Sequence, residues 1–321
     1  MAAPLVKTSP QDTCAPLRGR DLLSIRDLTR DELLALLALA ADVREQPARY
    51  AQALAGKTLA TIFEKPSLRT RVSFHVAVYQ LGAQAIDLGP QDIGLHGRET
   101  LEDVARTLDH LVDGLMIRTF AHDLVERLAT LASIPVINGL TDFSHPCQAL
   151  ADYLTMHDIK KRLTGLRLAF VGDGNNVANS LVFGAALLGV RMAIASPPGY
   201  EPQPDVLVWA GQHEMVKGTA CRVVRSPEEA VEGADVVYTD TWISMGQETE
   251  AEERRRVFAG FQVTETLLER AAPDAIFMHC LPAHRGEEVS AEVIDSTRSV
   301  VFQQAENRLH TEKGLLLALL S

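Results

Sequence analysis

The chain has 321 residues, 46% of them hydrophobic, which is enough to form the core of one large domain or two ordinary ones. The formal net charge of −11 disfavours a nucleic-acid-binding role, and charges of both signs along the chain argue against disorder. No apolar run approaches the length of about 18 residues that a membrane span needs, and no signal peptide is indicated. The four cysteines lack C-x-x-C spacing, so we predict neither a metal knuckle nor a redox pair. We predict a cytoplasmic location.

The first half of the chain has the pattern of alternating helices and strands. Residues 1–17 include three prolines and are expected to form a loose tail. Thr29 and Glu32 resemble a capping box at the start of a helix. Further along, the apolar pattern predicts strands and helices in the order strand 58–63, helix 72–81, strand 115–117, helix 124–131 and strand 135–137.

The second half continues this pattern. We predict strands at 166–171, 191–195, 236–239, 276–279 and 300–302, with helices between most of them. A long helix from about 148 to 161 is expected to leave the first sheet, and a last helix over 307–320 closes the chain. Strands alternating with helices indicate parallel sheets.

The fold class that follows is α/β, with two domains. We expect a first domain over residues 1–149 and a second over 150–321, each with a mostly parallel sheet flanked by helices. The last helix is expected to pack back toward the first domain. Ligands of parallel sheets bind at the carboxyl ends of strands, so the active site is predicted in the cleft between the domains.

A basic segment, Ser67-Leu68-Arg69-Thr70-Arg71, follows the first of these strands and opens a helix. Ser67 stands at the expected N-cap, where backbone N–H groups and the helix dipole favour a dianionic phosphate. Ser67 and Thr70 add hydroxyl donors, and Arg69 offers a guanidinium fork to phosphate oxygens. The alternative is a solvated basic helix start, which the position directly after a strand disfavours.

A second motif, His145-Pro146-Cys147-Gln148, comes after the strand at 135–137. Pro146 fixes a turn. His145 can donate a hydrogen bond to a developing oxyanion, and Gln148 can hold an amide NH2 through its side-chain oxygen. Taken alone, the motif favours a helix-entry turn that contains an incidental histidine.

The turn at 170–177 resembles a dinucleotide-binding loop but does not match its fingerprint. Val177 stands where the third glycine belongs, and the next strand ends at Ser196 instead of an acid that would bind a ribose. This disfavours a nucleotide-dependent oxidoreductase. We assign the turn to a small polar ligand, with Asn176 directed toward it.

The loop after the strand at 236–239 begins with Asp240 and contains Ser244-Met245-Gly246. Asp240 suits an ammonium group, while Ser244 and the Met245 backbone suit a carboxylate. Gly246 would allow the loop to move. The alternative is a solvent-exposed loop with an aspartate at the end of a strand.

The segment His279-Cys280-Leu281-Pro282 follows the strand at 276–279. It allows a thiol nucleophile, a metal cluster or a structural cysteine. Adjacent strand residues point to opposite faces, so His279 would not face the Cys280 thiol, and a third metal ligand is lacking. A positioning role for Cys280 is therefore favoured. Arg118 follows a strand of the first domain, and Arg308 opens the last helix. Each can supply a guanidinium to the site.

Together, these motifs resemble the aspartate/ornithine carbamoyltransferase family over residues 19–317. Residues 67–71 resemble the family's Ser-Thr-Arg-Thr-Arg, and residues 145–148 match its His-Pro-x-Gln. Asp240 with residues 244–246, and residues 279–282, resemble the ornithine branch; the aspartate branch lacks both.

The resemblance implies transfer of a carbamoyl group from carbamoyl phosphate to L-ornithine, giving citrulline and phosphate, in arginine biosynthesis or in the reverse, catabolic direction. No metal or other cofactor is expected. A sister enzyme acting on putrescine or N-acetylornithine is the alternative, and the intact reacting-centre residues disfavour a non-catalytic subunit.

The resemblance also implies which residues contact the substrates. Carbamoyl phosphate contacts are implied for Ser67, Leu68, Arg69, Thr70, Arg118, His145, Pro146, Cys147, Gln148, Cys280, Leu281 and Arg308. Ornithine contacts are implied for Asn176, Asp240, Ser244 and Met245. The catalytic residues would be Cys280, Arg69, His145 and Arg308. A homotrimer, or an assembly of trimers, is implied as well.

The sequence departs from the family pattern at three places. Leu68 replaces a small hydroxyl residue. Gly94 falls where the family often has a glutamine that reaches a neighbouring site, and His96 is a candidate substitute. His75 stands where a helix glutamate is usual, and the sequence gives no functional account of it.

Overall fold

The structure, a computed structural model, describes residues 14–93, 99–215 and 221–321. The chain divides into two compact units, one that extends to Leu154 and includes Glu306–Ser321, and one that covers Thr155–Ala305. The divisions fall within helices α8 (Pro146–Lys160) and α15 (Val301–Leu320). The sequence placed the boundary between residues 149 and 150. Gly94 and His96 lie outside the described residues.

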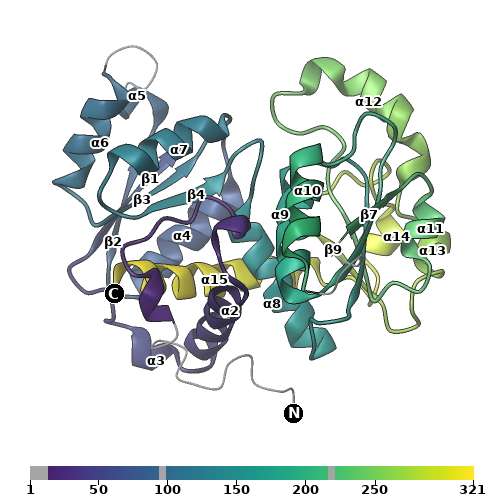
Figure 1. Cartoon of the computed structure of the whole chain (residues 1–321), viewed down its shortest axis with the longest axis horizontal. Coiled ribbons are helices and arrows are strands. Elements are labelled where there is room, and N and C mark those ends of the chain that lie inside the picture. The colour runs from purple at the N-terminus through teal and green to yellow at the C-terminus, as the bar shows by residue number, and fades with distance from the viewer. Residues whose placement is uncertain (1–13, 94–98, 216–220) are drawn as a thin grey trace. The chain divides into compact units, whose positions relative to one another are not determined.

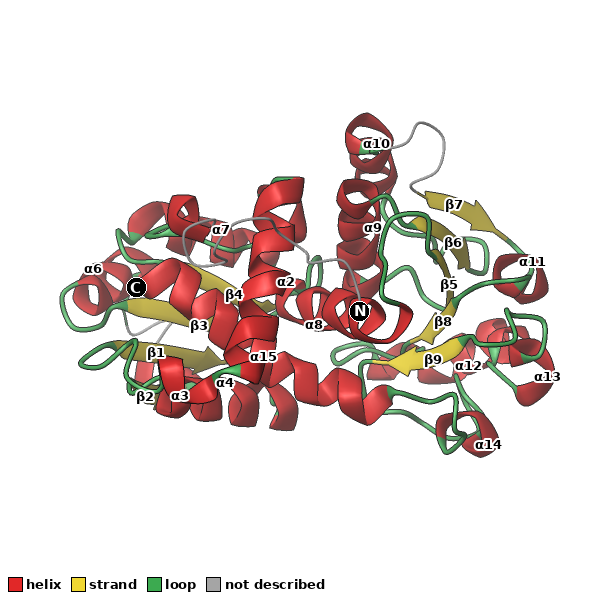
Figure 2. Cartoon of the chain, turned by 90° about the horizontal axis from the view of Figure 1, so that it is seen from below, coloured by secondary structure: helices red, strands yellow, loops and turns green. Residues whose placement is uncertain are grey.

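The first unit contains a parallel sheet of four strands in the order β2-β1-β3-β4 (Figure 1). Helices α6 and α7 cover one face, and helix α4 lies on the other (Figure 2). The strands are β1 (Thr58–Phe63), β2 (Gln84–Leu88), β3 (Gly114–Arg118) and β4 (Val136–Leu140). The helices before α8 are α2 (Arg30–Glu45), α3 (Pro47–Tyr50), α4 (Leu68–Gln80), α5 (Pro90–Ile93), α6 (Leu101–Asp109) and α7 (His122–Leu131).

The second unit contains a parallel sheet of five strands in the order β7-β6-β5-β8-β9. Helices α9 and α10 lie on one face, and α11, α13 and α14 pack on the other (Figure 2). The strands are β5 (Arg167–Val171), β6 (Arg191–Ala195), β7 (Cys221–Val224), β8 (Val236–Thr239) and β9 (Ile276–His279). The helices are α9 (Asn176–Leu188), α10 (Pro204–His213), α11 (Pro227–Val231), α12 (Ala251–Phe258), α13 (Glu265–Leu268) and α14 (Ala291–Ile294).

Local capping explains where the helices that matter for the site begin. Thr29 and Glu32 form the predicted capping box of α2. Ser67 caps α4, and Asn175 caps α9 by accepting hydrogen bonds from the backbone N–H groups of Val177 and Ala178. Because all strands are parallel, the loops that lead to α4 and α9 emerge at the carboxyl ends of their sheets.

Two features of the fold differ from the sequence prediction. The predicted strand 300–302 is wrong, since Val301 begins α15; only Ser299 forms a bridge to Phe277 of β9. Strands β2 and β7 were missed. Each lies at the edge of its sheet and carries exposed or half-buried residues, so neither shows the apolar run of a central strand.

The described part of the predicted tail is packed and not loose. Ala15–Leu17 form a 3₁₀ helix, and the side chains of Cys14 and Leu17 are buried. Their burial adds apolar contact area that a run of prolines alone did not indicate.

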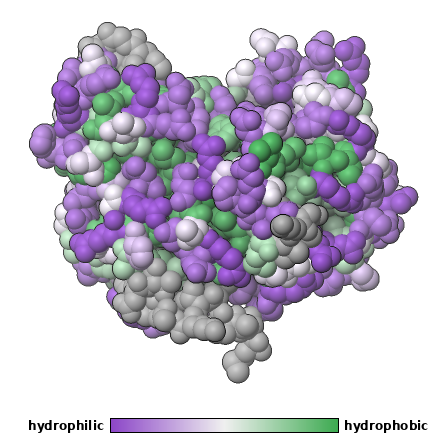
Figure 3. Space-filling model, in the orientation of Figure 1, coloured by the Kyte–Doolittle hydropathy of each residue, from purple (hydrophilic) through white to green (hydrophobic). Residues whose placement is uncertain are grey.

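Hydrophilic residues dominate the face of the molecule shown in Figure 3, with smaller hydrophobic patches between them. No helix among the described residues is long and apolar enough to cross a membrane.

The contact between α15 and α2 gives a stability prediction. A Cβ atom added at Gly314 would lie 3.0 Å from the backbone nitrogen of Ala40 and 3.1 Å from its Cα atom. Gly314→Val should therefore lower the free energy of unfolding by roughly 1–3 kcal/mol through overpacking. Gly211→Val is the matched control, because nothing lies within 4 Å of its Cβ position. Equal urea-unfolding midpoints for the two variants would contradict this account.

Candidate active site

The basic segment opens α4 as predicted. The Ser67 hydroxyl accepts a hydrogen bond from the backbone N–H of Thr70 at 3.2 Å. No acidic residue lies in the first turn of this described helix, so the positive end of its dipole is not neutralised locally. Leu68 is 75% exposed, so its side chain does not build the cluster around the buried Thr70.

Arg308 brings several of the predicted residues of the first unit together. Its buried guanidinium donates to the Thr70 hydroxyl at 3.0 Å and to Gln148 Oε1 at 3.1 Å. It also lies 3.4 Å from His145 Nε2, and Glu312 accepts from it at 2.9 Å. Residues from α4, α8 and α15 thus converge on one cation.

His145 is held as a neutral imidazole. Burial lowers its pKa well below the ordinary value, and the nearby guanidinium groups of Arg308, Arg118 and Arg69 lower it further. Because a guanidinium only donates hydrogen bonds, Nε2 must accept from Arg308, which leaves the ring hydrogen on Nδ1. The imidazole therefore offers an N–H donor and no extra charge.

The buried carboxylate of Glu312 balances Arg308. Burial raises the Glu312 pKa to about 7, against the lowering influence of Arg308. Burial also disfavours the charged form of Arg308, but the Glu312 carboxylate more than offsets this, so the Arg308 pKa is raised. Arg308 therefore keeps its charge in the cluster.

The rest of the HPCQ turn has structural contacts. Pro146 begins α8, as its fixed backbone favours. Cys147 is fully buried with its thiol directed at the Asn138 carbonyl, and burial raises its pKa, so the thiol stays protonated. Gln148 donates to Asp152 at 2.8 Å while its oxygen accepts from Arg308, and that oxygen has a second lone pair for a ligand.

In the second unit, Asp240 is the centre of a separate cluster. Asn175 donates to Asp240 Oδ2 at 2.7 Å, and the Cys280 thiol lies 2.9 Å from Oδ1 as a donor. The backbone N–H of Thr241 donates to Oδ1 at 2.8 Å. These contacts fix the orientation of the carboxylate, which supports the predicted positioning role of Cys280.

His279 does not activate the Cys280 thiol. Its Nδ1 accepts from the backbone N–H of Leu281 at 2.8 Å, and its Nε2 lies 3.1 Å from Glu288. The ring is fully buried. Leu281 has φ of 59°, an uncommon value that the His279 contact helps to hold.

The loop that follows Asp240 contains Ser244, Met245 and Gly246. The Ser244 N–H donates to Gln247 at 3.0 Å, Met245 is partly exposed, and Gly246 has φ of 94°. Asn176 is the first residue of α9, and its carbonyl accepts from the Ser180 hydroxyl. The adjacent Asn175, which the sequence prediction passed over, donates to Asp240, and the ornithine contact of Asn176 stays a prediction.

Three further residues with a role in the two clusters were missed. Asn175 could have been found as an N-cap residue, and Glu312 as an acid four residues after Arg308 on a helix. Gln304 accepts from the backbone N–H of His279 at 2.9 Å, and no sequence signal pointed to it.

Two groups of described residues offer possible metal ligands within 4.8 Å of one another, namely Asp240, His279 and Cys280, and His284, Glu287 and Glu288. Protein contacts already engage them. Cys280 donates to Asp240, His279 binds Leu281 and Glu288, and Glu287 accepts from Arg255 at 3.0 Å. Chemistry without a metal stays a prediction.

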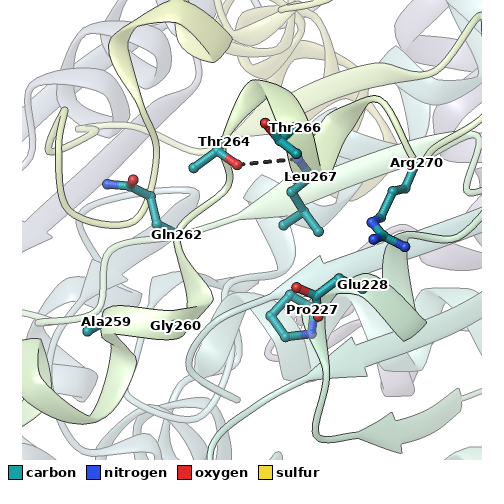
Figure 4. A pocket seen from close by; sticks show the side chains of 9 residues that line it. All are labelled: Pro227, Glu228, Ala259, Gly260, Gln262, Thr264, Thr266, Leu267 and Arg270. Atoms are coloured by element: carbon teal, nitrogen blue, oxygen red, sulfur yellow. Dashed lines mark hydrogen bonds between the residues drawn. The ribbon is translucent and has the colours of Figure 1, made fainter.

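A pocket of about 300 Å³ lies in the second unit (Figure 4). The Thr264 hydroxyl on its wall accepts from the backbone N–H of Leu267 and so caps α13. None of its lining residues belongs to the predicted site, and we assign it no substrate. They are Pro227, Glu228, Ala259, Gly260, Gln262, Thr264, Thr266, Leu267 and Arg270.

Two family models match the chain. Residues 20–158 match the carbamoyl-P binding domain of aspartate/ornithine carbamoyltransferase, and residues 164–319 match the Asp/Orn binding domain. Together they cover most of the chain.

Individual relatives agree with these matches. The chain is 54% identical over 302 residues to an ornithine carbamoyltransferase of Thermococcus kodakarensis, covering 94% of this chain and 96% of the relative. It is also 54% identical to an ornithine carbamoyltransferase of Anoxybacillus flavithermus, covering 95% and 98%. Among solved structures, the Pyrococcus furiosus ornithine carbamoyltransferase superposes with a TM-score of 0.91 at 51% identity, covering 95% and 98%.

The neutral state of His145 predicts a pH dependence of stability. An unfolded histidine takes up a proton below about pH 6.5, whereas native His145, with its lowered pKa, does not. Its stabilising contribution is thus present above that pH and is lost as the pH falls, by up to about 1.4 kcal/mol per pH unit until the native imidazole protonates.

Gln does not titrate, so between pH 6.5 and 5 the free energy of unfolding of His145→Gln should improve relative to the wild type by roughly that slope. Urea unfolding at several pH values measures the difference. Parallel pH profiles for the two proteins would show that His145 titrates normally in the native state.

Proposed function

The chain belongs to the aspartate/ornithine carbamoyltransferase family, and we propose that it transfers the carbamoyl group of carbamoyl phosphate to the side-chain amine of L-ornithine. The observation that carries the proposal is the meeting of Thr70, His145 and Gln148 around the Arg308 guanidinium at the start of α4. That arrangement offers donors to a carbonyl oxygen beside a helix start that suits phosphate. A citrulline assay with carbamoyl phosphate and a panel of amines tests it.

Carbamoyl phosphate would bind to the first unit. Its phosphate would lie at the helix start, with the Ser67 hydroxyl, the Leu68 N–H and the guanidinium groups of Arg69 and Arg118 as donors. Arg118 ends β3, and both arginines are close enough to His145 to lower its pKa. The local positive charge thus matches a dianion.

The carbonyl of the carbamoyl group would be polarised by Thr70, His145 and Arg308. The remaining lone pair of Gln148 Oε1 and the Leu281 carbonyl would accept from the NH2 group. Pro146 and Cys147 would shape this end of the pocket through their backbone. Donors fixed before the reaction stabilise a developing oxyanion without a reorganisation cost.

L-Ornithine would bind to residues of the second unit. Asp240 would pair with the α-ammonium group, Asn176 would bind the polar end of the substrate, and Ser244 with the Met245 backbone would hold the carboxylate. Cys280 and Asn175 would keep the Asp240 carboxylate oriented. Both oxygens of the Asp240 carboxylate are held in place before the substrate arrives, which would reduce the entropic cost of binding.

The chemical step is an acyl transfer. The neutral side-chain amine attacks the carbonyl carbon, the new C–N bond forms, and the electron pair of the C=O bond moves to the oxygen. Collapse of this tetrahedral oxyanion breaks the bond to the phosphate oxygen, which leaves with the electron pair as phosphate and accepts the proton that the amine loses. Catalysis is then largely positioning and oxyanion stabilisation, and we propose that it requires no metal or other cofactor.

Putrescine and N-acetylornithine fit the second unit less well. Putrescine lacks the carboxylate that Ser244 and the Met245 backbone would bind, and N-acetylornithine lacks the charged α-ammonium that would pair with Asp240. The names of relatives favour a biosynthetic direction, because those of Pyrococcus furiosus and Campylobacter jejuni are called anabolic.

We also propose a homotrimer, or an assembly of trimers, in the cytoplasm. Helix α4 exposes Leu68, Val72 and Tyr79, three large apolar side chains at spacings of four and seven residues, and Ile86 is exposed on the adjacent edge strand β2. An exposed apolar face next to an open strand edge supports contact between copies of the chain.

Arg69 gives a direct test of phosphate binding. If Arg69 forms a desolvated contact to phosphate, Arg69→Ala should cost roughly 2–3 kcal/mol, which is about 30- to 150-fold in carbamoyl phosphate affinity by calorimetry. Arg106→Ala, on the exposed surface of α6, is the control and should bind normally. Unchanged affinity of the Arg69 variant would remove Arg69 from the site.

The amine preference tests the assignment of the Asp240 loop. Putrescine would leave two carboxylate donors unpaired, at roughly 1–3 kcal/mol each, so kcat/KM should favour ornithine by at least about 100-fold. Asp240→Asn should damage ornithine turnover far more than carbamoyl phosphate binding. Asp205→Asn, in the exposed first turn of α10, is the matched control. Equal use of putrescine and ornithine by the native enzyme would make the loop assignment wrong.

A further inference from the structure

Lys65 is a buried cation beside the phosphate segment that the proposed chemistry does not use. Only 3% of the residue is exposed, although lysine is almost never fully buried without a partner. Its ammonium donates to Asp142 Oδ1 and lies 4.2 Å from the centroid of the Phe120 ring. The ammonium is therefore held by an ion pair and a cation–π contact at once.

These two partners come from the loops after two other strands. Lys65 follows β1, Phe120 follows β3 and Asp142 follows β4. One ammonium thus joins the loops at the carboxyl ends of three strands of the first sheet. Residues proposed to bind carbamoyl phosphate lie at the same places: Ser67 on the β1 loop, Arg118 at the end of β3, and His145 on the β4 loop.

Backbone hydrogen bonds tie the same loops together. The N–H of Glu64 donates to the Arg118 carbonyl at 2.9 Å, and the N–H of Asp142 donates to the Phe120 carbonyl at 2.8 Å. The Thr119 hydroxyl donates to the Glu64 carboxylate. The ion pair between Lys65 and Asp142 connects the β1 loop to the β4 loop. These two strands are not neighbours, because β3 lies between them in the sheet.

We propose that Lys65 is a positioning residue, which acts through Asp142 to hold the phosphate segment in register with Arg118 and His145. The proposal rests on the assignment of carbamoyl phosphate to the first unit. Donors to one small dianion must be placed within a fraction of an ångström, and a shift of about 1 Å costs on the order of 100-fold in rate. A buried ammonium without Asp142 would be left uncompensated, so the loop would move to hydrate it.

Asp142 distinguishes this role from direct binding of phosphate by Lys65. Its side chain is 62% exposed and carries a negative charge on the loop that leads to His145. If Lys65 simply bound phosphate, Asp142→Asn would leave affinity unchanged or improve it, because a charge that repels the dianion is removed. The positioning role predicts the opposite sign.

The experiment compares Asp142→Asn, Lys65→Met, Lys65→Arg and the Asp142→Asn/Lys65→Met double variant. Calorimetry with carbamoyl phosphate and with inorganic phosphate reports binding, and citrulline assays report kcat and both KM values. We expect each loss-of-charge single variant to weaken carbamoyl phosphate binding by about 10- to 100-fold. The double variant should be no weaker than the worse single variant, and Lys65→Arg should recover part of the loss.

The ion pair between Lys57 and Asp113 is the matched control. It joins the residues that precede β1 and β3, at the opposite end of the same strands, with an N–O distance of 3.0 Å. Asp113→Asn should change the unfolding temperature without changing the KM for carbamoyl phosphate. A general loss of stability would affect both sites alike, whereas the positioning role affects only Asp142.

Three results would overturn the proposal. They are carbamoyl phosphate affinity in Asp142→Asn equal to or above that of the native enzyme, additive losses in the double variant, and an equal KM increase in Asp113→Asn. Because Asp142 is largely exposed, its variant tests the proposal even where Lys65→Met does not fold. If the native enzyme itself neither binds carbamoyl phosphate nor forms citrulline, the proposed function fails instead.

Discussion

A buried guanidinium must be surrounded by acceptors, and the requirement of Arg308 for such partners organises the first unit. Thr70, Gln148 and Glu312 come from three different helices and His145 from the turn before α8, yet all four meet around this one group. A buried charge that lost its partners would cost several kcal/mol, so the helices are held in the one arrangement that satisfies it. The residues assigned to catalysis are therefore positioned by the same contacts that make burial of Arg308 tolerable.

The charges around His145 follow from this arrangement. Burial and three nearby arginines lower the pKa of His145, so its ring is neutral beside guanidinium groups that keep their charge. A neutral N–H donor is suited to a carbonyl oxygen, because it stabilises a developing negative charge. Unlike an imidazolium, it carries no acidic proton that could protonate the attacking amine. The Glu312 carboxylate, whose pKa burial raises to about 7, is an i,i+4 partner on α15 and accepts from the same Arg308 nitrogen as Thr70. It balances the arginine without removing its charge.

The sequence located these clusters well because their signals are local. A serine cap before a basic turn, a proline at the start of a helix and an aspartate at the end of a strand are each determined by neighbouring residues, and Ser67, Pro146 and Asp240 lie where predicted. The elements that the sequence analysis missed depend on tertiary contacts. Strands β2 and β7 exist because they pair with β1 and β6, not because of their own apolar pattern.

The same distinction explains the errors among individual residues. Asn175 was missed, because the spacing gives a helix start but not the contact of its side-chain amide with Asp240. Residues 300–302 were predicted as a strand because a short apolar run does not distinguish a strand from a helix. The helix-favouring residues that follow make Val301 the start of α15. Gln304, which holds the β9 end at His279, is a long-range contact without a sequence signature.

The net charge of −11 does not by itself oppose an anionic ligand, because the effect of each charge falls with its distance from the binding site. At physiological ionic strength the Debye length is about 8 Å, so most surface carboxylates are screened from a ligand in a buried site. Nearby groups decide the local potential instead, and the guanidinium groups of Arg69, Arg118 and Arg308 are near enough to His145 to lower its pKa. In the second unit three donors orient the Asp240 carboxylate. The described residues thus present guanidinium groups around His145 in the first unit and an oriented carboxylate, Asp240, in the second, and the two clusters favour ligand groups of opposite charge.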